Sequence, residues 1–110
     1  MPRVYIINRA GHDFSAAEKY GELSYLSEGE QNRFAVGGMY RKFAELIEFS
    51  HEDDYLLITS LTVMSTIAAS MMGYKHGRLN LLLFKNGKYI ERKLLLSELL
   101  TRWDGGENSE

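Results

Sequence analysis

The chain has 110 residues, of which 45% are hydrophobic and 12% aromatic; this composition supports one hydrophobic core and excludes a disordered chain. A formal net charge of −2 excludes a basic field for non-specific nucleic-acid binding, so we do not expect nucleic acid as a partner. The lack of cysteine excludes disulfides and thiolate chemistry, and the N-terminus shows no signal-peptide pattern, so we expect a cytoplasmic protein.

The first half of the chain predicts two strands and two helices. Residues 4–7 are β-branched and aromatic, which indicates a buried strand. Ser15 is expected to cap a short helix, with Glu18 completing a capping box. Residues 23–26 predict a second short strand, followed by a polar surface loop. Residues 39–49 then predict a helix whose apolar face consists of Met39, Phe43, Leu46 and Ile47.

Residues 55–74 contain no charged side chain, and twenty such residues equal the length of a membrane helix. Six hydroxyl side chains and a change of character midway argue against a membrane span. Residues 55–59 form a continuous apolar block typical of a buried strand. Residues 63–72 predict a helix that ends at Gly73, with Ser60 or Thr62 as its N-cap. We therefore expect a strand and a helix inside a folded domain, and no membrane partner.

The C-terminal part predicts a β-hairpin and a last helix. Residues 79–84 are apolar on both faces, as in an interior strand, and Asn86-Gly87 is a strong hairpin-turn signal. Residues 89–95 place Ile90, Arg92 and Leu94 on one face and Tyr89, Glu91 and Lys93 on the other, which is typical of a charged edge strand. Ser97 is expected to cap a short helix containing Leu99, Leu100 and Trp103, and residues 104–110 are expected to form a flexible tail.

Together these elements predict one small three-layer α/β domain over residues 1–103. Its sheet is expected to be mixed and mostly parallel, with helices on both faces and a C-terminal β-hairpin.

Polar side chains follow the first and the middle strand, and parallel strands end at the same edge of a sheet, where ligands bind. The candidate ligand-binding residues are Asn8, Arg9, His12, Ser60, Thr62, Ser65 and Thr66. A helix beginning near Thr62 offers free N–H groups to an anion, so the pattern predicts a phosphate or nucleotide pocket. Each residue also has a structural explanation: Ser60 and Thr62 as caps, Arg9 as a surface charge, and His12 and Asp13 as turn residues.

Three function classes fit this sequence. The first is a small binding module for a phosphate-bearing or nucleotide ligand. The second is a protein-interaction factor, such as an inhibitor or accessory protein. The third is a phosphodiesterase-like hydrolase, with His12 as acid or base, Asp13 orienting it and Arg9 stabilising charge. No cofactor or metal-binding motif is present, so we expect neither.

The element order is similar in outline to small dimeric viral ring nucleases that cleave cyclic oligoadenylate. The histidine of that family lies at the start of the later helix, where this chain has Ser60-Leu61-Thr62. The resemblance therefore implies a nucleotide ligand and transfers no catalytic residue. Separately, the uncharged face of the helix from Thr62 to Ser70 carries hydroxyls where solvent would favour charge. This face is expected to pack against a second copy of the helix, another part of the chain or a ligand, and we favour a homodimer through that helix.

Overall fold

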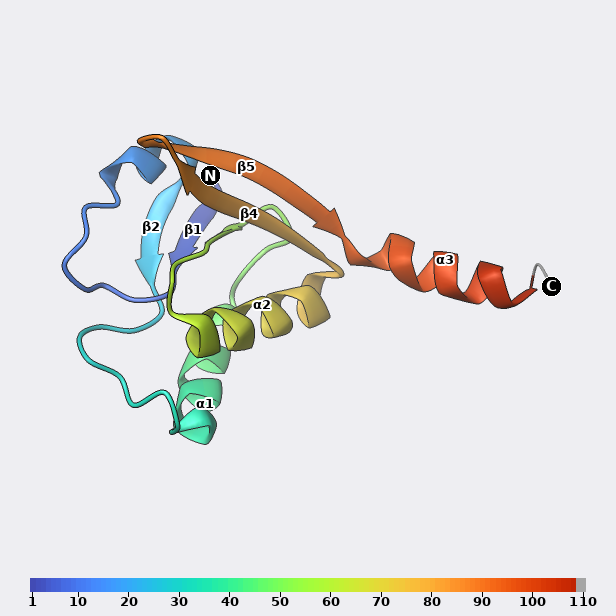
Figure 1. The fold of residues 1–110 in the computed structure, drawn as a ribbon, viewed down its shortest axis with the longest axis horizontal. Helices are drawn as coiled ribbons and strands as arrows, with labels where there is room; N and C mark the ends of the chain where they lie inside the picture. The colour runs from blue at the N-terminus through green and yellow to red at the C-terminus, as the bar shows by residue number, and fades with distance from the viewer. Residues whose placement is uncertain (109–110) are drawn as a thin grey trace.

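One five-stranded sheet organises the molecule (Figure 1). The computed structural model describes residues 1–108, and side chains up to residue 104. In sheet order the strands are β2 (Glu22–Tyr25), β1 (Arg3–Ile6), β3 (Tyr55–Leu57), β4 (Arg78–Lys85) and β5 (Lys88–Leu95). The first four run parallel, and β5 pairs antiparallel with β4. This confirms the predicted α/β class, with a mixed, mostly parallel sheet and a C-terminal hairpin.

Helices cover both faces of the sheet, as predicted. The 3-10 helix η1 (Ser15–Tyr20) lies on one face, while α1 (Val36–Ile47) and α2 (Thr62–His76) cover the other. Alternation along β1 divides the core, because successive side chains of a strand point to opposite faces. The α1/α2 side holds Tyr5, Ile7, Leu26, Met39, Phe43, Ile47, Leu56, Met64, Ala68, Met72 and Leu79. The η1 side holds Val4, Ile6, Phe14, Ala17, Leu57, Leu82 and Tyr89.

The uncharged segment, residues 55–74, divides between β3 and α2, as the change in its side-chain composition midway predicts. No helix in the described part of the chain has both the length and the hydropathy needed to cross a bilayer. The predicted end of α2 at Gly73 is wrong, because the helix continues to His76 and ends at Gly77 in a left-handed conformation (φ 67°). Gly73 serves packing instead: a Cβ there would lie 2.8 Å from Leu96 Cδ1.

Three predicted helix starts also differ from the structure. Ser15 lies inside η1, whose N-cap is Phe14 without a side-chain cap. The Ser15 N–H instead donates to Asp13 Oδ1 at 2.9 Å, and this hydrogen bond lowers the pKa of Asp13 below its ordinary value. The helix α1 begins at Val36, three residues before the predicted start, so two glycines lie in its first turn. The last helix, α3 (Leu96–Asn108), begins one residue before Ser97.

Two predicted features at the surface also need correction. Leu46 was expected on the buried face of α1 but is 36% exposed, whereas the other three predicted residues of that face are buried. The helix α3 extends through residue 108 and so includes most of the segment expected to be a flexible tail. Residues 109 and 110 lie outside the described part of the chain.

The hairpin and the charged edge strand are as predicted. Asn86 and Gly87 both have positive φ, 50° and 78°, the conformation that an Asn-Gly turn permits. The strand β5 has β4 as its one neighbour in the sheet order and carries four charged residues, Lys88, Glu91, Arg92 and Lys93. Its charges oppose pairing with another sheet edge.

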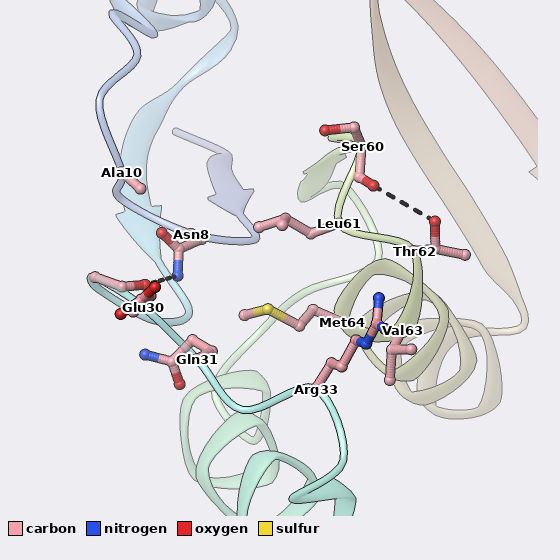
Figure 2. Close-up of a pocket in the computed structure, with 11 residues that line it drawn as sticks. Asn8, Ala10, Glu30, Gln31, Arg33, Ser60, Leu61, Thr62, Val63 and Met64 are labelled. Carbon is pink, nitrogen blue, oxygen red and sulfur yellow. Dashed lines mark hydrogen bonds between the residues drawn. The ribbon is translucent and has the colours of Figure 1, made fainter.

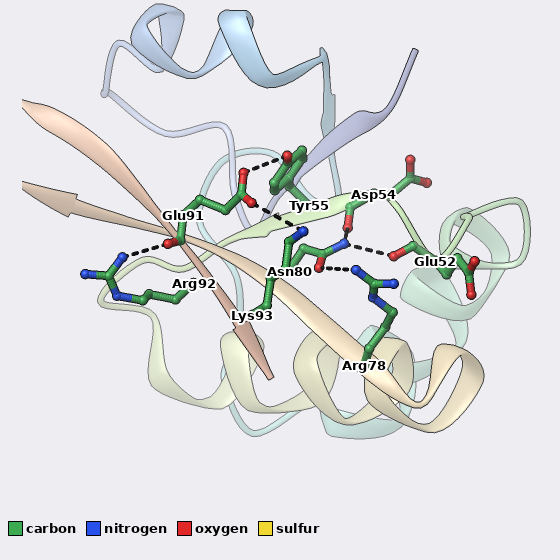
Figure 3. Close-up of polar contacts among 8 residues, drawn as sticks. All are labelled: Glu52, Asp54, Tyr55, Arg78, Asn80, Glu91, Arg92 and Lys93. Atoms are coloured by element: carbon green, nitrogen blue, oxygen red, sulfur yellow. Dashed lines mark hydrogen bonds and ion pairs between the residues drawn. The ribbon is translucent and has the colours of Figure 1, made fainter. Parts of the chain in front are cut away.

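A polar network closes the amino-terminal edge of the parallel strands (Figure 3). The Asp54 carboxylate accepts the N–H groups of Arg3 at 2.9 Å and His51 at 2.8 Å. Asn80 Nδ2 donates to the carbonyl oxygen of Asp54 at 3.2 Å. Beside it, burial and the Glu91 carboxylate, which accepts the phenol proton at 2.8 Å, raise the pKa of Tyr55 to about 12. These hydrogen bonds tie the start of β1 to the turn before β3 and to β4.

His76, the last residue of α2, lies against Ser50. Ser50 Oγ donates to Ile47 O and lies 2.7 Å from His76 Nε2, so it accepts the imidazole proton. Burial, reinforced by the charge of Lys75, lowers the pKa of His76 below its ordinary value.

We expect the lowered pKa of His76 to make the free energy of unfolding depend on pH. The stability should be complete above the unfolded pKa of about 6.5 and should decrease as pH falls below it, because the unfolded chain then binds more protons than the folded one. Urea unfolding at about pH 8 and about pH 5.5 measures the loss. His76→Gln should show a smaller loss, since carboxylates contribute equally to both proteins. An equal loss would contradict the assignment.

Candidate functional site

Two hollows lie at the carboxyl ends of the strands. The first, here called the α2 pocket, has a volume of about 480 Å³ (Figure 2). It is lined by Asn8, Ala10, Gly29, Glu30, Gln31, Arg33, Ser60, Leu61, Thr62, Val63 and Met64. The second, here called the η1 hollow, is lined by His12, Asp13, Phe14, Leu57, Ile58, Thr59, Ser60, Leu83, Phe84 and Tyr89. Ser60 contributes to both.

Asn8 and Ser60 meet in the α2 pocket because β1 and β3 are parallel neighbours. The Asn8 side chain is buried and holds the loop after β2: its Nδ2 donates to Ser27 Oγ at 2.8 Å and to Gly29 O at 2.9 Å. Its Oδ1 has no hydrogen-bond partner within the described residues. Asn8 therefore shapes one wall of the pocket and leaves one acceptor without a donor there.

The N-terminus of α2 forms the opposite wall. Its N-cap is Leu61, and no side chain caps it, so the expected capping by Ser60 or Thr62 is wrong. Thr62 Oγ1 instead donates to Ser60 O at 3.4 Å. The first intrahelical bond is that of Ser65 N–H to Leu61 O, which leaves the preceding three N–H groups without a partner in the described part of the chain. Uncapped N–H groups and the helix dipole favour an anion at this wall.

Charges of opposite sign stand at the two ends of the pocket. Figure 2 shows the Arg33 guanidinium beside the start of α2, near Thr62 and Val63. Glu30 lies at the other end, beside Asn8. Both come from the loop between β2 and α1. The pocket therefore offers a cation and helix N–H groups at one end and a carboxylate at the other.

Several predicted residues lie elsewhere. Arg9 Nη1 pairs with Glu28 at 3.6 Å, and its guanidinium lies 5.0 Å from the centroid of the Tyr25 ring. His12 lies in the η1 hollow together with Asp13. Ser65 is buried and donates to Thr59 O, while Thr66 Oγ1 donates to Thr62 O at 2.8 Å. Of the seven predicted ligand-binding residues, the α2 pocket brings together Asn8, Ser60 and Thr62.

Sequence reasoning missed Arg33, Glu30 and Gln31. They belong to a polar segment without periodicity, so no pattern marked them. The usable signal was topological: β2 is parallel to β1, so the loop that leaves it must start at the same edge of the sheet as Asn8.

Comparison with known proteins identifies the family. A family model described as "Phage Pam3 gp32-like protein" matches residues 2–95. The chain belongs to this family. No curated protein and no solved structure was matched in the corresponding searches. The match to the Pam3 gp32-like family runs from before β1 to the last residue of β5, so both hollows lie within it.

In this Pam3 gp32-like protein the α2 pocket has the features of a small-molecule site. Its volume is within the usual range for such sites, and its polar groups converge from three segments of the chain. The arrangement can hold an anionic group at the start of α2 and hydrogen-bond donors at Glu30. Among its lining residues Glu30 is the one carboxylate and Arg33 the one cation.

Proposed function

We propose that this protein is a binding module for a small phosphate-bearing ligand, most consistently a nucleotide, held in the α2 pocket. The observation that carries the proposal is the uncapped N-terminus of α2 facing the same pocket as Arg33. Helix N–H groups and a guanidinium are the donors that proteins use for phosphate.

The acidic end of the pocket supports a nucleotide over inorganic phosphate. A carboxylate repels a free anion but accepts hydrogen bonds from sugar hydroxyls, as acidic residues do in dinucleotide sites. Glu30 is separated from Arg33 along the pocket, so a ligand with an anionic end and a hydroxyl-bearing end matches both.

Binding is favoured over hydrolysis because the proposed acid–base pair and the anion site are apart. His12 and Asp13 line the η1 hollow, and neither lines the α2 pocket. A general acid must lie within hydrogen-bond reach of the group it protonates. A phosphate at Arg33 therefore has no histidine beside it in this geometry.

Replacing Arg33 tests the ligand site. Nucleotides and phosphate compounds should raise the melting temperature of the wild-type protein, and Arg33→Ala should weaken binding by roughly tenfold or more, since a hydrogen bond to a charged group contributes about 1.5–3 kcal/mol. Differential scanning fluorimetry with a panel of mono-, di- and cyclic nucleotides measures the effect.

The matched control is Arg9→Ala, which removes an exposed arginine outside the α2 pocket and should retain the full thermal shift. Glu30→Gln should reduce the shift with nucleotides and leave or increase the shift with inorganic phosphate. A panel that shifts nothing, or equal losses in Arg33→Ala and Arg9→Ala, would reject the α2 pocket as the site.

We also propose that the protein forms a homodimer through the exposed side of α2. Thr62, Thr66 and Ser70 are exposed on this side at four-residue spacing and carry no charge. The predicted face is narrower in the structure than the sequence suggests, because Ser65 faces the core.

A cysteine-free chain needs no oxidising compartment, which supports the cytoplasm as its location.

A further inference from the structure

The helix α3 carries an apolar stripe that nothing in the described chain covers. Leu99, Leu100 and Trp103 are 41%, 61% and 60% exposed. With Leu96 they repeat at intervals of three and four residues, the spacing of one helix face. A contiguous exposed apolar surface of this kind marks a contact site in a soluble protein.

The start of α3 is held against its own domain at Leu96, and the rest of the stripe, Leu99, Leu100 and Trp103, is exposed. The strand β5 ends at Leu95 and α3 begins at Leu96, with no linker between them. The N–H groups of Leu96 and Ser97 both donate to Gly77 O, at 2.9 and 3.2 Å. The Leu96 side chain also packs against Gly73. Figure 1 shows the result: α3 projects away from the sheet and from α2.

A groove of matching character runs between α1 and α2, with a volume of about 760 Å³; we call it the α1–α2 groove. Its walls are Tyr40, Ala44, Ile47 and Glu48 from α1 and its end, and Thr66, Ile67, Ser70, Met71, Tyr74 and Lys75 from α2. Tyr40 and Tyr74 are 55% and 94% exposed at its rims. The groove shares no lining residue with the α2 pocket.

The stripe on α3 and the α1–α2 groove match in length and in charge. At 1.5 Å per residue, the exposed stripe from Leu99 to Trp103 is about 6 Å long and fits within the α2 wall of the groove, which is about 14 Å long from Thr66 to Lys75. On the helical wheel Arg102 and Asp104 flank Trp103 on opposite sides. Glu48 and Lys75 lie together at one end of the groove, where Lys75 Nζ donates to the Glu48 carbonyl oxygen. A helix docked in the groove would place Arg102 near Glu48 and Asp104 near Lys75.

We infer that α3 of one copy docks in the α1–α2 groove of a second copy, and that the exchange is reciprocal about a two-fold axis. This inference rests on the proposed homodimer and names the element that covers the exposed side of α2. Trp103 is the anchor, because buried aromatic side chains dominate such contacts. The uncharged stripe of α2 then faces an apolar helix rather than solvent.

Sizing by light scattering over a concentration series is the first test. The wild-type chain should be a dimer, and Trp103→Asp should raise the dimer dissociation constant roughly tenfold or more. Ser70→Tyr, which fills the groove from an exposed position, should act in the same direction. Phe84→Asp is the matched control, since Phe84 is 63% exposed outside both surfaces.

Each outcome decides a separate point. A monomer at every concentration overturns both the homodimer and the docking of α3. A dimer that responds no more to Trp103→Asp than to Phe84→Asp overturns the docking alone and leaves the homodimer in place. Neither outcome bears on ligand binding at the α2 pocket, which is measured separately.

Because the chain has no cysteine, cross-linking can test the geometry directly. A mixture of one chain carrying Leu100→Cys and another carrying Ser70→Cys should form a mixed disulfide. Disulfides only between two Leu100→Cys chains would show pairing of α3 with α3 and overturn the proposal. Arg102→Glu should weaken the dimer, and Glu48→Arg in the same chain should restore it; no restoration would overturn the proposed pairing of these charges.

Discussion

Phe43→Ala is expected to lower the free energy of unfolding by about 3–5 kcal/mol, the largest loss for a single substitution proposed here. Phe43 is fully buried in the core between α1 and the sheet, together with Met39 and Ile47. Truncation removes apolar burial and leaves a cavity that neighbours anchored in helix and strand cannot fill. Urea unfolding followed by circular dichroism measures the loss.

The matched control is Phe49→Ala, which removes the same side chain just beyond the end of α1. Phe49 is 71% exposed, so its replacement should change stability by no more than about 0.5 kcal/mol. A comparable loss in both variants would mean that α1 does not pack as described here, and would remove one wall of the α1–α2 groove.

Gly21→Ala is expected to lower the free energy of unfolding by about 3 kcal/mol. A Cβ on Gly21 would lie 2.1 Å from the carbonyl oxygen of Pro2, and a backbone atom cannot rotate away as a side chain can. Relief requires moving the start of β2 away from the chain before β1, where Glu22 N–H donates to Pro2 O at 3.2 Å. The β2 edge of the sheet would therefore be disturbed.

Gly38→Ala provides a control of opposite sign. Gly38 lies within α1, and a Cβ there meets nothing within 4 Å, so alanine should stabilise the helix by about 0.5–1 kcal/mol. Thermal unfolding of both variants separates steric exclusion at Gly21 from the general effect of replacing glycine. A stable Gly21→Ala protein would contradict the close approach of β2 to Pro2.

The fold could be predicted because its main signals are local. The uncharged run contained both its strand and its helix, and Asn86-Gly87 identified the hairpin turn. Predictions failed at helix ends, where competing explanations fit the same residue. Glycine is typical of a helix end, which favoured Gly73 as the end of α2. Its role in packing depends on Leu96, which comes more than twenty residues later in the sequence.

The candidate site was predictable only in part. Asn8, Ser60 and Thr62 follow strands that the pattern identifies, and parallel pairing brings them together. Arg33 enters from a polar loop without periodicity, while Arg9, which follows the carboxyl end of β1, pairs with Glu28 and lies over the Tyr25 ring. Which of two arginines reaches an anion site depends on loop path and on competing partners, and neither is encoded at a fixed spacing.

The sequence by itself determined the order of strands and helices along the chain, and it placed the candidate site at the carboxyl ends of the first and middle strands. These follow from burial, because apolar residues on a buried face recur every two residues in a strand and every three to four residues in a helix. Only the tertiary structure decided that Arg33 and Glu30 line the α2 pocket, that His12 faces the other side of the sheet, and that α3 extends beyond the domain. Those are relations between distant residues, set by how loops run and by what the packed core leaves uncovered.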